Sequence, residues 1–221
     1  MSTIITGAGG ALGRAVVEAF LADGATVFGV DLSWRERAHA SERFHPVEAN
    51  ILEAGACERV AQAAAPVDRL VHLVGGFAGG KPVAETGDDV WDQMMNMNLR
   101  AAVAMFRAVL PQMVAARRGS IVAIASRAAV EPMAGFAAYS VSKAALVALV
   151  KTVALEVRDS GVNVNAVMPS VIDTPANRKA MAGADFSKWV APESVAKLLV
   201  WLTSEAGRDV SGAAVPVYGR A

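Results

Sequence analysis

Three side chains in the second half of the chain have the types and spacing needed for proton transfer. Tyr139 and Lys143 lie four residues apart in a segment with a helical pattern, so their side chains share one face of the helix. A tyrosine of ordinary pKa, ~10, needs a nearby ammonium to stabilise its phenolate before it can exchange protons at neutral pH. Ser126 ends a β-branched run thirteen residues earlier. Tyrosine–lysine pairs also decorate solvated helices, but this tyrosine is one of only two and follows a strand ending in serine, which favours an acid/base site.

The glycine-rich loop near the start of the chain predicts a binding site for a dinucleotide. The stretch TIITGAGGALGRAVVEAF, residues 3–20, enters a loop with Gly7, Gly9, Gly10 and Gly13 and continues as a helical pattern. Glycines let the backbone turn tightly and approach a ligand, and the free N–H groups of a helix start favour a pyrophosphate. A tight turn with glycines for steric reasons alone is the alternative. Because the loop opens a βαβ unit, the context favours dinucleotide binding.

Asp31, at the end of the second predicted strand, predicts which dinucleotide binds. A carboxylate at this position accepts hydrogen bonds from the adenosine ribose hydroxyls and repels a 2′-phosphate. Neither the glycine loop nor Leu32 supplies a base for that phosphate, and Arg35 and Arg37 are interpreted as a solvated helix start. The alternative for Asp31 is a helix cap or turn residue. The sequence therefore favours NAD (NADH) over NADP.

The elements that must position these side chains alternate along the chain. Apolar strands between amphipathic helices indicate a parallel sheet covered on both faces. Strands are predicted at 2–6, 25–30, 69–74, 119–126, 162–167 and, weakly, 213–218, and helices at 11–23, 53–64, 88–117, 137–159 and 192–204. The irregular stretch 169–190 contains two prolines and a glycine, and predicts a substrate lid at about 170–190 that is mobile without ligand. We expect residues 1–221 to form one domain.

Composition limits the partners and the compartment. Lys+Arg and Asp+Glu both number 21, so nothing indicates binding to nucleic acid or to an anionic membrane surface. The single cysteine, Cys57, fits a reducing compartment, and we expect a cytoplasmic location. The first strand begins by Thr3, which leaves no room for a signal peptide. No apolar run is expected to reach the ~20 residues that span a bilayer.

Six motifs occur in an order that identifies a family. They are TGAGGALG (6–13), LVHLVGG (70–76), NMNL (96–99), Ser126, YSVSK (139–143) and MPSVIDT (168–174). From end to end the chain resembles the short-chain dehydrogenase/reductase family. The resemblance implies an α/β fold, a three-layer doubly wound parallel sheet of the Rossmann type, with strand order 3-2-1-4-5-6-7.

The same resemblance implies roles for individual residues. Asn98, Ser126, Tyr139 and Lys143 would form a catalytic tetrad. Tyr139 would be the acid/base, Lys143 would bind the nicotinamide ribose and lower the tyrosine pKa, Ser126 would hold the substrate oxygen, and Asn98 would hold a water. No metal is expected, because the cofactor carries the hydride. The implied cofactor contacts are Gly7, Gly9, Gly10, Ala11, Leu12, Gly13, Asp31, Leu32, Asn50, Ile51, Val74, Gly75, Gly76, Tyr139, Lys143, Pro169, Val171, Ile172 and Thr174.

The chain departs from the family pattern at four places. Ala11 replaces a common glycine, His72–Gly75 replaces Asn-Asn-Ala-Gly, Asn50 replaces an aspartate, and Ser170 replaces the glycine after Pro169. These changes affect contacts to the adenine and the nicotinamide rather than the fold. A ligand or catalytic base is one interpretation of His72; we interpret it as a hydrogen-bonded structural residue.

Two stretches are similar to the dihydropteridine reductases, which use NADH to reduce a quinonoid pterin. They are VGGFAGG (74–80) and IDTPANRKAMAGADFSKW (172–189). That branch lacks the serine at the strand end, whereas this chain keeps Ser126. Because a quinonoid ring needs no serine to polarise a carbonyl, Ser126 favours interconversion of a carbonyl and an alcohol. Reduction of a pterin stays the alternative.

The sequence also predicts substrate contacts and the assembly of the protein. Phe77, Arg127, Met133 and Trp189 are predicted to contact a small-molecule substrate because they lie in segments around the expected nicotinamide site. Apolar residues on more than one face of the helices 88–117 and 137–159 predict a homodimer or homotetramer. A dinucleotide-binding protein without turnover is a second alternative, but it has no need of Ser126, Tyr139 and Lys143 together.

Overall fold

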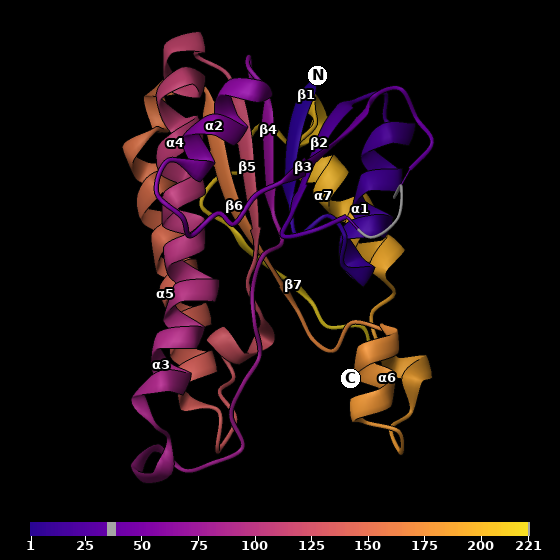
Figure 1. Cartoon of the computed structure of the whole chain (residues 1–221), viewed down its shortest axis with the longest axis vertical. Helices are drawn as coiled ribbons and strands as arrows, with labels where there is room; N and C mark the ends of the chain where they lie inside the picture. The colour runs from indigo at the N-terminus through magenta and orange to yellow at the C-terminus, as the bar shows by residue number, and fades with distance from the viewer. Residues whose placement is uncertain (35–38, 221) are drawn as a thin grey trace.

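The computed structural model describes residues 1–34 and 39–220. Their strands form one seven-stranded parallel sheet (Figure 1). The strand order is β3-β2-β1-β4-β5-β6-β7, as predicted. The strands are β1 Ser2–Thr6, β2 Thr26–Asp31, β3 Phe44–Glu48, β4 Arg69–His72, β5 Gly119–Ile124, β6 Val162–Pro169 and β7 Ala214–Val217. Since every pairing is parallel, all the carboxyl ends of the strands meet at one edge of the sheet.

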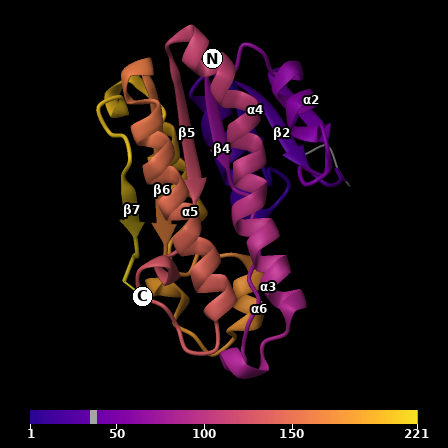
Figure 2. The same cartoon turned by 90° about the vertical axis from the view of Figure 1, so that its left-hand side faces the viewer.

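Helices cover both faces of the sheet (Figure 1). The helices are α1 Ala11–Ala22, α2 Ala56–Ala63, α3 Asp88–Met95, α4 Ala101–Ala116, α5 Ala137–Glu156, α6 Pro175–Ala180 and α7 Pro192–Leu202. One core joins the sheet to α2, α4 and α5, and a second joins its other face to α1 and α7. Figure 2 shows α4 and α5 side by side in front of the sheet, with α3 and α6 beyond the carboxyl ends of the strands.

The strand β3 has no counterpart among the predicted runs, although the predicted order requires a strand at this edge. Its sequence FHPVE carries a proline and leaves His45, Pro46 and Glu48 exposed. An edge strand pairs on one side only and tolerates proline and polar residues, so it lacks the apolar signal of an inner strand. Phe44 alone is buried, packed where a side chain on Gly29 would lie 2.6 Å from its ring.

Two inner strands end earlier than predicted, which lengthens the loops that carry functional residues. β4 ends at His72 instead of residue 74, and β5 ends at Ile124 instead of Ser126. The predicted helix 88–117 is α3 and α4 joined through a π-helical segment at Asn96–Arg100. Turns of this kind occur often at functional sites, and this one contains Asn98.

The stretch 169–190 contains more regular secondary structure than predicted. It contains α6 and a 3₁₀ turn at Phe186–Lys188. Its two ends are joined, because Val190 N–H donates to Val171 O at 2.9 Å and Asp173 N–H donates to Val190 O at 2.8 Å. Thr174 caps α6 by accepting from Asn177 N–H at 3.2 Å, and Pro175 follows at the first helical position. Its mobility without ligand stays a prediction.

Two helical stretches differ from the expectation that no apolar run reaches the length that spans a bilayer. Asp88–Ala116 and Ala137–Glu156 are long and apolar enough to cross a membrane by length and composition alone. Both stretches contribute buried side chains to the core that covers the sheet, among them Met105, Phe106 and Leu146. Their length and composition are therefore weak evidence of a membrane span, since a helix packed on a sheet has the same features.

Candidate active site

Ser126, Tyr139 and Lys143 come together at the carboxyl edge of the sheet. Ser126 follows β5, and its Oγ accepts from Ala128 N–H at 3.2 Å, which caps the 3₁₀ turn Arg127–Ala129. Tyr139 lies in the first turn of α5 and Lys143 one turn later. The Ser126 side chain lies close enough to the Tyr139 phenol to lower its pKa. The predicted serine, tyrosine and lysine therefore form one cluster between the end of a strand and the start of a helix.

Lys143 is a buried amine, only 5% exposed. Its Nζ donates to the carbonyl of Ile124, the last residue of β5, at 2.9 Å. Burial penalises the ammonium and lowers the pKa of Lys143 from 10.5 to about 8. A lysine with this pKa is still mostly protonated at neutral pH, but it is poised to exchange a proton.

The pKa of Tyr139 differs from the sequence-based expectation of a lowered value. Burial raises the pKa of Tyr139, and the hydrogen bond with the Ser126 side chain partly opposes that rise. Lys143, whose ammonium donates to the Ile124 carbonyl, does not contribute to this shift. The phenol is therefore held as a proton donor, which suits the protonation of a substrate oxygen.

Asn98 joins three elements through its side-chain amide. Its Oδ1 accepts from Gly76 N–H at 2.8 Å, and its Nδ2 donates to Gly76 O at 3.1 Å and to Ser142 Oγ at 3.0 Å. Ser142 Oγ in turn donates to the Tyr139 carbonyl at 2.7 Å. Ser142 was not predicted, although its place three residues after Tyr139 on the same helix could have indicated it.

Gly75 leaves open the space in front of the lysine. A side chain at this position would lie 2.7 Å from Asn98 Oδ1 and 3.0 Å from Lys143 Nζ. Val74, Gly75 and Gly76 belong to the loop after β4, which runs past both side chains. The backbone can therefore approach the amine closely only because residue 75 is a glycine.

The glycine loop has the close packing expected of a cradle for phosphates. A side chain on Gly13 would lie 2.2 Å from Gly7 O, so only glycine allows α1 to start this close to the loop. Gly7 has φ +71°, a conformation that favours glycine. Gly10 precedes the first helical residues, Ala11 and Leu12, whose N–H groups are free as in any first turn. The loop can hold a pyrophosphate through backbone groups alone.

Asp31 ends β2 beside this loop. Its Oδ2 accepts from Gly9 N–H at 2.8 Å, and its Oδ1 accepts from Leu32 N–H at 2.8 Å. Two backbone N–H groups therefore hold the Asp31 carboxylate beside the glycine loop, an arrangement that differs from a helix cap. Arg35 and Arg37, considered in the sequence analysis, lie outside the described residues.

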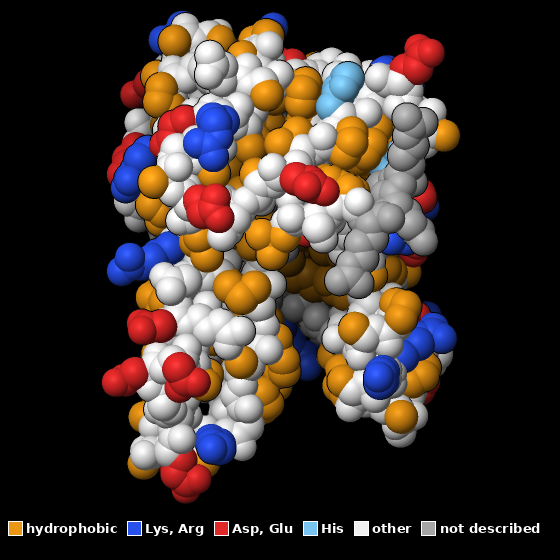
Figure 3. Space-filling view, in the orientation of Figure 1, with side chains coloured by type: hydrophobic (Ala, Val, Ile, Leu, Met, Phe, Trp, Pro, Cys, Tyr) orange, Lys and Arg blue, Asp and Glu red, His pale blue; other side chains and the backbone are white. Residues whose placement is uncertain are grey.

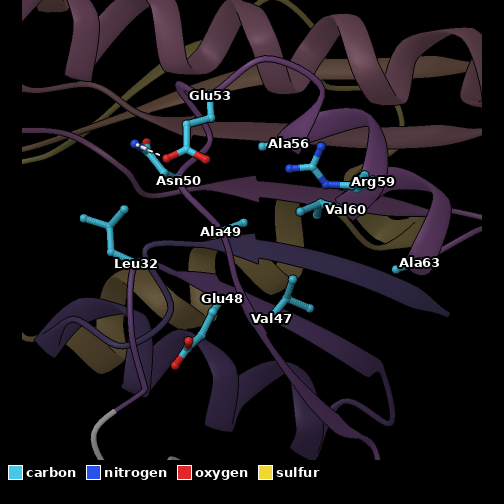
Figure 4. Close-up of a pocket in the computed structure, with 10 residues that line it drawn as sticks. All are labelled: Leu32, Val47, Glu48, Ala49, Asn50, Glu53, Ala56, Arg59, Val60 and Ala63. Carbon is cyan, nitrogen blue, oxygen red and sulfur yellow. Dashed lines mark hydrogen bonds between the residues drawn. The ribbon is translucent and has the colours of Figure 1, made fainter.

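A cavity of about 470 Å³ opens between β3 and α2 next to Asp31 (Figure 4). Leu32 and Asn50, two predicted cofactor contacts, lie at one end of it, and Glu48, Glu53 and Arg59 are its charged residues. Asn50 accepts from Leu52 N–H at 3.1 Å and donates to Glu53 at 3.3 Å, so it orders the loop after β3. Ile51 is buried behind it.

The predicted contacts after β6 follow the end of that strand. Pro169 is its last residue, and Val171, Ile172 and Thr174 lead into α6. Ser170, which replaces the family's glycine, donates to the Tyr218 carbonyl at 2.7 Å and ties this loop to the end of β7. The loop is therefore anchored at its start.

The four predicted substrate residues have different neighbours in the structure. Phe77 lies against Tyr139, and Met133 is 46% exposed in the loop before α5. Trp189 packs on Phe186, with ring centroids 4.7 Å apart. Arg127 lies over the Tyr218 ring at 5.5 Å and pairs with Glu131. Phe77 is the one with a direct contact to the predicted acid/base.

His72 has the structural role that the sequence analysis favoured. It is fully buried, and its Nδ1 lies 3.0 Å from Thr6 Oγ1, which also accepts from Leu73 N–H at 3.2 Å. Burial lowers the pKa of His72 to about 3, so the imidazole is neutral at physiological pH. It joins β1 to β4 at the point where the loop to Gly75 begins.

Comparison with known proteins gives a consistent assignment. Residues 2–185 match the family described as short chain dehydrogenase. The short chain dehydrogenase ple7 of Rhodocybe pseudopiperita is 30% identical over 97% of this chain and 95% of its own length. The 3-oxoacyl-[acyl-carrier-protein] reductase FabG of Thermotoga maritima is 28% identical over 98% of this chain and 95% of its own.

A solved structure agrees with the sequence comparisons. An oxidoreductase of the short chain dehydrogenase/reductase family from Burkholderia thailandensis superposes with a TM-score of 0.87 at 33% identity, covering 98% of this chain and 90% of the other. The sheet order, the glycine loop and the serine–tyrosine–lysine cluster are consistent with the same family. This chain therefore belongs to the short-chain dehydrogenase/reductase family and is a nicotinamide-dependent oxidoreductase.

Proposed function

We propose that this enzyme interconverts a carbonyl and an alcohol with NAD(H), using Tyr139 as the acid/base. The observation that carries the proposal is that Ser126 and Tyr139 lie together after β5, with the buried amine of Lys143 one helical turn from Tyr139. In the reducing direction the Tyr139 phenol gives its proton to the substrate oxygen, and Ser126 holds that oxygen. Lys143 then returns a proton to the tyrosine, and a water held at Asn98 would resupply the lysine.

The residues at the carboxyl edge fit a nicotinamide dinucleotide. Gly13 lets α1 start close to the glycine loop, and Gly75 lets the loop after β4 pass close to Asn98 and Lys143. The glycine loop would hold the pyrophosphate, and Lys143 would bind the nicotinamide ribose. When bound, the cofactor supplies or accepts the hydride.

Preference for NAD rests on Asp31 and its surroundings. A carboxylate held by Gly9 and Leu32 accepts from ribose hydroxyls and repels a 2′-phosphate. Glu48 and Glu53 add negative charge to the neighbouring cavity. Arg59 lies toward the opposite end of that cavity from Leu32 in the view of Figure 4.

Replacing Asp31 by alanine should shift the cofactor preference toward NADP. Losing the charged acceptor removes hydrogen bonds worth roughly 1.5–3 kcal/mol, so the ratio of kcat/KM for NADH over NADPH should fall about 10- to 100-fold. Steady-state kinetics with each cofactor measure this ratio. Asp209→Ala, at an aspartate whose side chain is 96% exposed, is the matched control and should leave the ratio unchanged. An unchanged ratio in Asp31→Ala would show that Asp31 does not contact the ribose.

A turnover screen tests the proposed reaction. Ketones, hydroxyacyl compounds and a quinonoid dihydropterin are each offered with NADH and NADPH, and Tyr139→Phe is run beside the wild type. Turnover of a ketone or hydroxyacyl compound that depends on Tyr139 supports the proposal. Binding of the cofactor without turnover of any compound would favour a dinucleotide-binding protein instead.

Reduction of a quinonoid pterin is the second candidate. It is favoured by the stretch 74–80, which carries Phe77 against Tyr139, and by the similar stretch 172–189 that forms most of the segment with α6. The two candidates differ in what they require of Ser126, because only a carbonyl oxygen needs to be held.

Replacing Ser126 by alanine separates these candidates. For a ketone, kcat/KM should fall about 10²- to 10³-fold, as when an oxyanion donor is removed. For a quinonoid dihydropterin the fall should be less than about 10-fold, because no serine is needed to polarise a carbonyl. The measurement is kcat/KM for both compounds with wild type and Ser126→Ala. Equal losses on both would contradict the assigned role of the serine.

The homodimer or homotetramer stays a prediction. Exposed apolar side chains on the covering helices support it, among them Val114 on α4, Leu155 on α5 and Trp201 on α7.

A further inference from the structure

Phe77 is a large aromatic residue left open at the site. Its side chain is 62% exposed, although its ring lies 4.8 Å from that of Tyr139, centroid to centroid, at an interplanar angle of 79°. Exposed apolar groups beside an acid/base are typical of a surface that a ligand covers. Phe77 therefore has an unfilled contact surface next to the Tyr139 ring.

The ring of Phe77 is held in place rather than free. Phe136 stacks on it, with centroids 4.9 Å apart and an interplanar angle of 22°. Phe136 covers one face of the ring, and 62% of the Phe77 side chain stays exposed. Because it contacts both Phe136 and Tyr139, the ring has little rotamer freedom left to lose when a ligand binds.

The backbone around Phe77 is built to keep this stack. Gly80 N–H donates to Gly135 O at 2.8 Å, which joins the loop after β4 to the loop before α5. A side chain on Gly79 would lie 2.4 Å from the Phe136 ring, so the approach requires glycine. Gly79, Gly80 and Gly135 all have positive φ. These three glycines bring Phe77 and Phe136 together at the mouth of the site.

The molecule is hollowed on the side of the sheet where the carboxyl ends of the strands lie. Figure 3 shows a deep notch between the part of the molecule that carries α3 and the part that carries α6, with apolar side chains at its top and along one wall. Met133, 46% exposed, adds a polarisable side chain to the loop that bears Phe136. A flat ring stacked on the exposed part of Phe77 would lie within the usual ~4.5–7 Å spacing of aromatic pairs and close to Tyr139.

We propose that Phe77 is a specificity-determining residue that selects a substrate with a planar aromatic or quinonoid ring next to its reacting carbon. This inference rests on the proposed function and names the class of substrate for the same site. The open face of Phe77 stacks the planar ring and so presents the reacting group to Tyr139. A saturated ring of the same size fills the same volume but lacks the ring–ring contact.

Two ketones of matched shape test this proposal. In 2-tetralone the ring with the carbonyl is fused to a benzene ring, and trans-2-decalone is its saturated analogue. The measured quantity is the ratio of kcat/KM for 2-tetralone over trans-2-decalone. Phe77→Leu should lower this ratio about 2- to 10-fold, the effect of one lost aromatic contact, and Phe77→Tyr should keep it. Any displacement of Tyr139 by the substitution acts on both ketones and cancels in the ratio.

The control is Phe28→Leu, the same substitution in an aromatic pair far from the cleft. Phe28 lies on β2 and stacks on His45 at 4.8 Å. Its substitution should leave the ratio unchanged. A ratio that is also unchanged in Phe77→Leu would overturn the role of Phe77, while turnover that depends on Tyr139 would leave the proposed function standing.

A binding measurement decides the case in which the wild type reduces neither ketone. Titration calorimetry gives the affinity of each ketone for the enzyme saturated with NAD⁺, which cannot reduce them. Tighter binding of 2-tetralone that is lost in Phe77→Leu and kept in Phe77→Tyr supports the proposal even if the reaction type is wrong. Equal affinity of wild type and Phe77→Leu for 2-tetralone would overturn it.

Discussion

Tyr139→Phe should lose about 10²- to 10⁴-fold in kcat while NADH binds with nearly the wild-type affinity. The substitution removes only the hydroxyl, which burial keeps protonated and which Ser126 orients. The ring that contacts Phe77 remains, and so do the glycine loop, Asp31 and Lys143. The loss is therefore confined to the proton transfer. Steady-state kinetics on a substrate found in the screen, with fluorescence titration of NADH, measure the two effects separately.

Tyr218→Phe is the matched control, since Tyr218 is the other tyrosine of the chain. It keeps the ring beneath Arg127 and removes a hydroxyl that has no part in the proposed reaction. It should retain wild-type kcat. If Tyr139→Phe turned over as fast as Tyr218→Phe, the proton would have to come from another group, and the proposed mechanism would be wrong.

Lys143→Met should make the protein more stable and the enzyme much less active. A pKa lowered from 10.5 to about 8 corresponds to roughly 3 kcal/mol of unfavourable folding free energy at neutral pH. Methionine removes the buried charge but leaves the Ile124 carbonyl without its donor, so the net gain at pH 7 should be about 1–3 kcal/mol. Turnover should fall about 10²-fold or more, and NADH should bind roughly 10-fold more weakly.

The pH dependence of the stability gain follows from the two pKa values of the lysine. Below pH 8 the amine is protonated in both the folded and the unfolded chain, so the full cost of burying the charge is present. Between pH 8 and 10.5 the folded protein has lost this proton and the unfolded chain still binds it, so the wild type becomes relatively more stable. The advantage of Lys143→Met should therefore shrink across this range and nearly vanish above it.

Urea unfolding of wild type and Lys143→Met at pH 7 and pH 10 tests this. Lys151→Met, at an exposed lysine two turns further along α5, is the control and should change neither stability nor turnover appreciably. A Lys143→Met protein that is less stable than the wild type at pH 7 would mean that the buried ammonium contributes favourably to folding.

Residues close together in the chain could be read from the sequence, because their relation depends on local geometry. Tyr139 and Lys143 share a helix face through the helical period, and the glycine loop lies between adjoining elements of one βαβ unit. The strand order followed from the family resemblance. The edge strand β3 was missed because an exposed strand with a proline does not alternate in polarity.

Contacts between distant segments were decided only by the tertiary structure. Lys143 is buried against a carbonyl 19 positions away, and Asn98 donates to Ser142 across 44 positions. The sequence alone predicted a tyrosine pKa lowered by the lysine, whereas burial in the folded protein raises it. The chain order therefore determined which groups are available for the chemistry. Packing of loops from β4, β5 and α5 against one another determined their pKa values, their partners and the open aromatic face of Phe77, because burial and distance are properties of the folded chain.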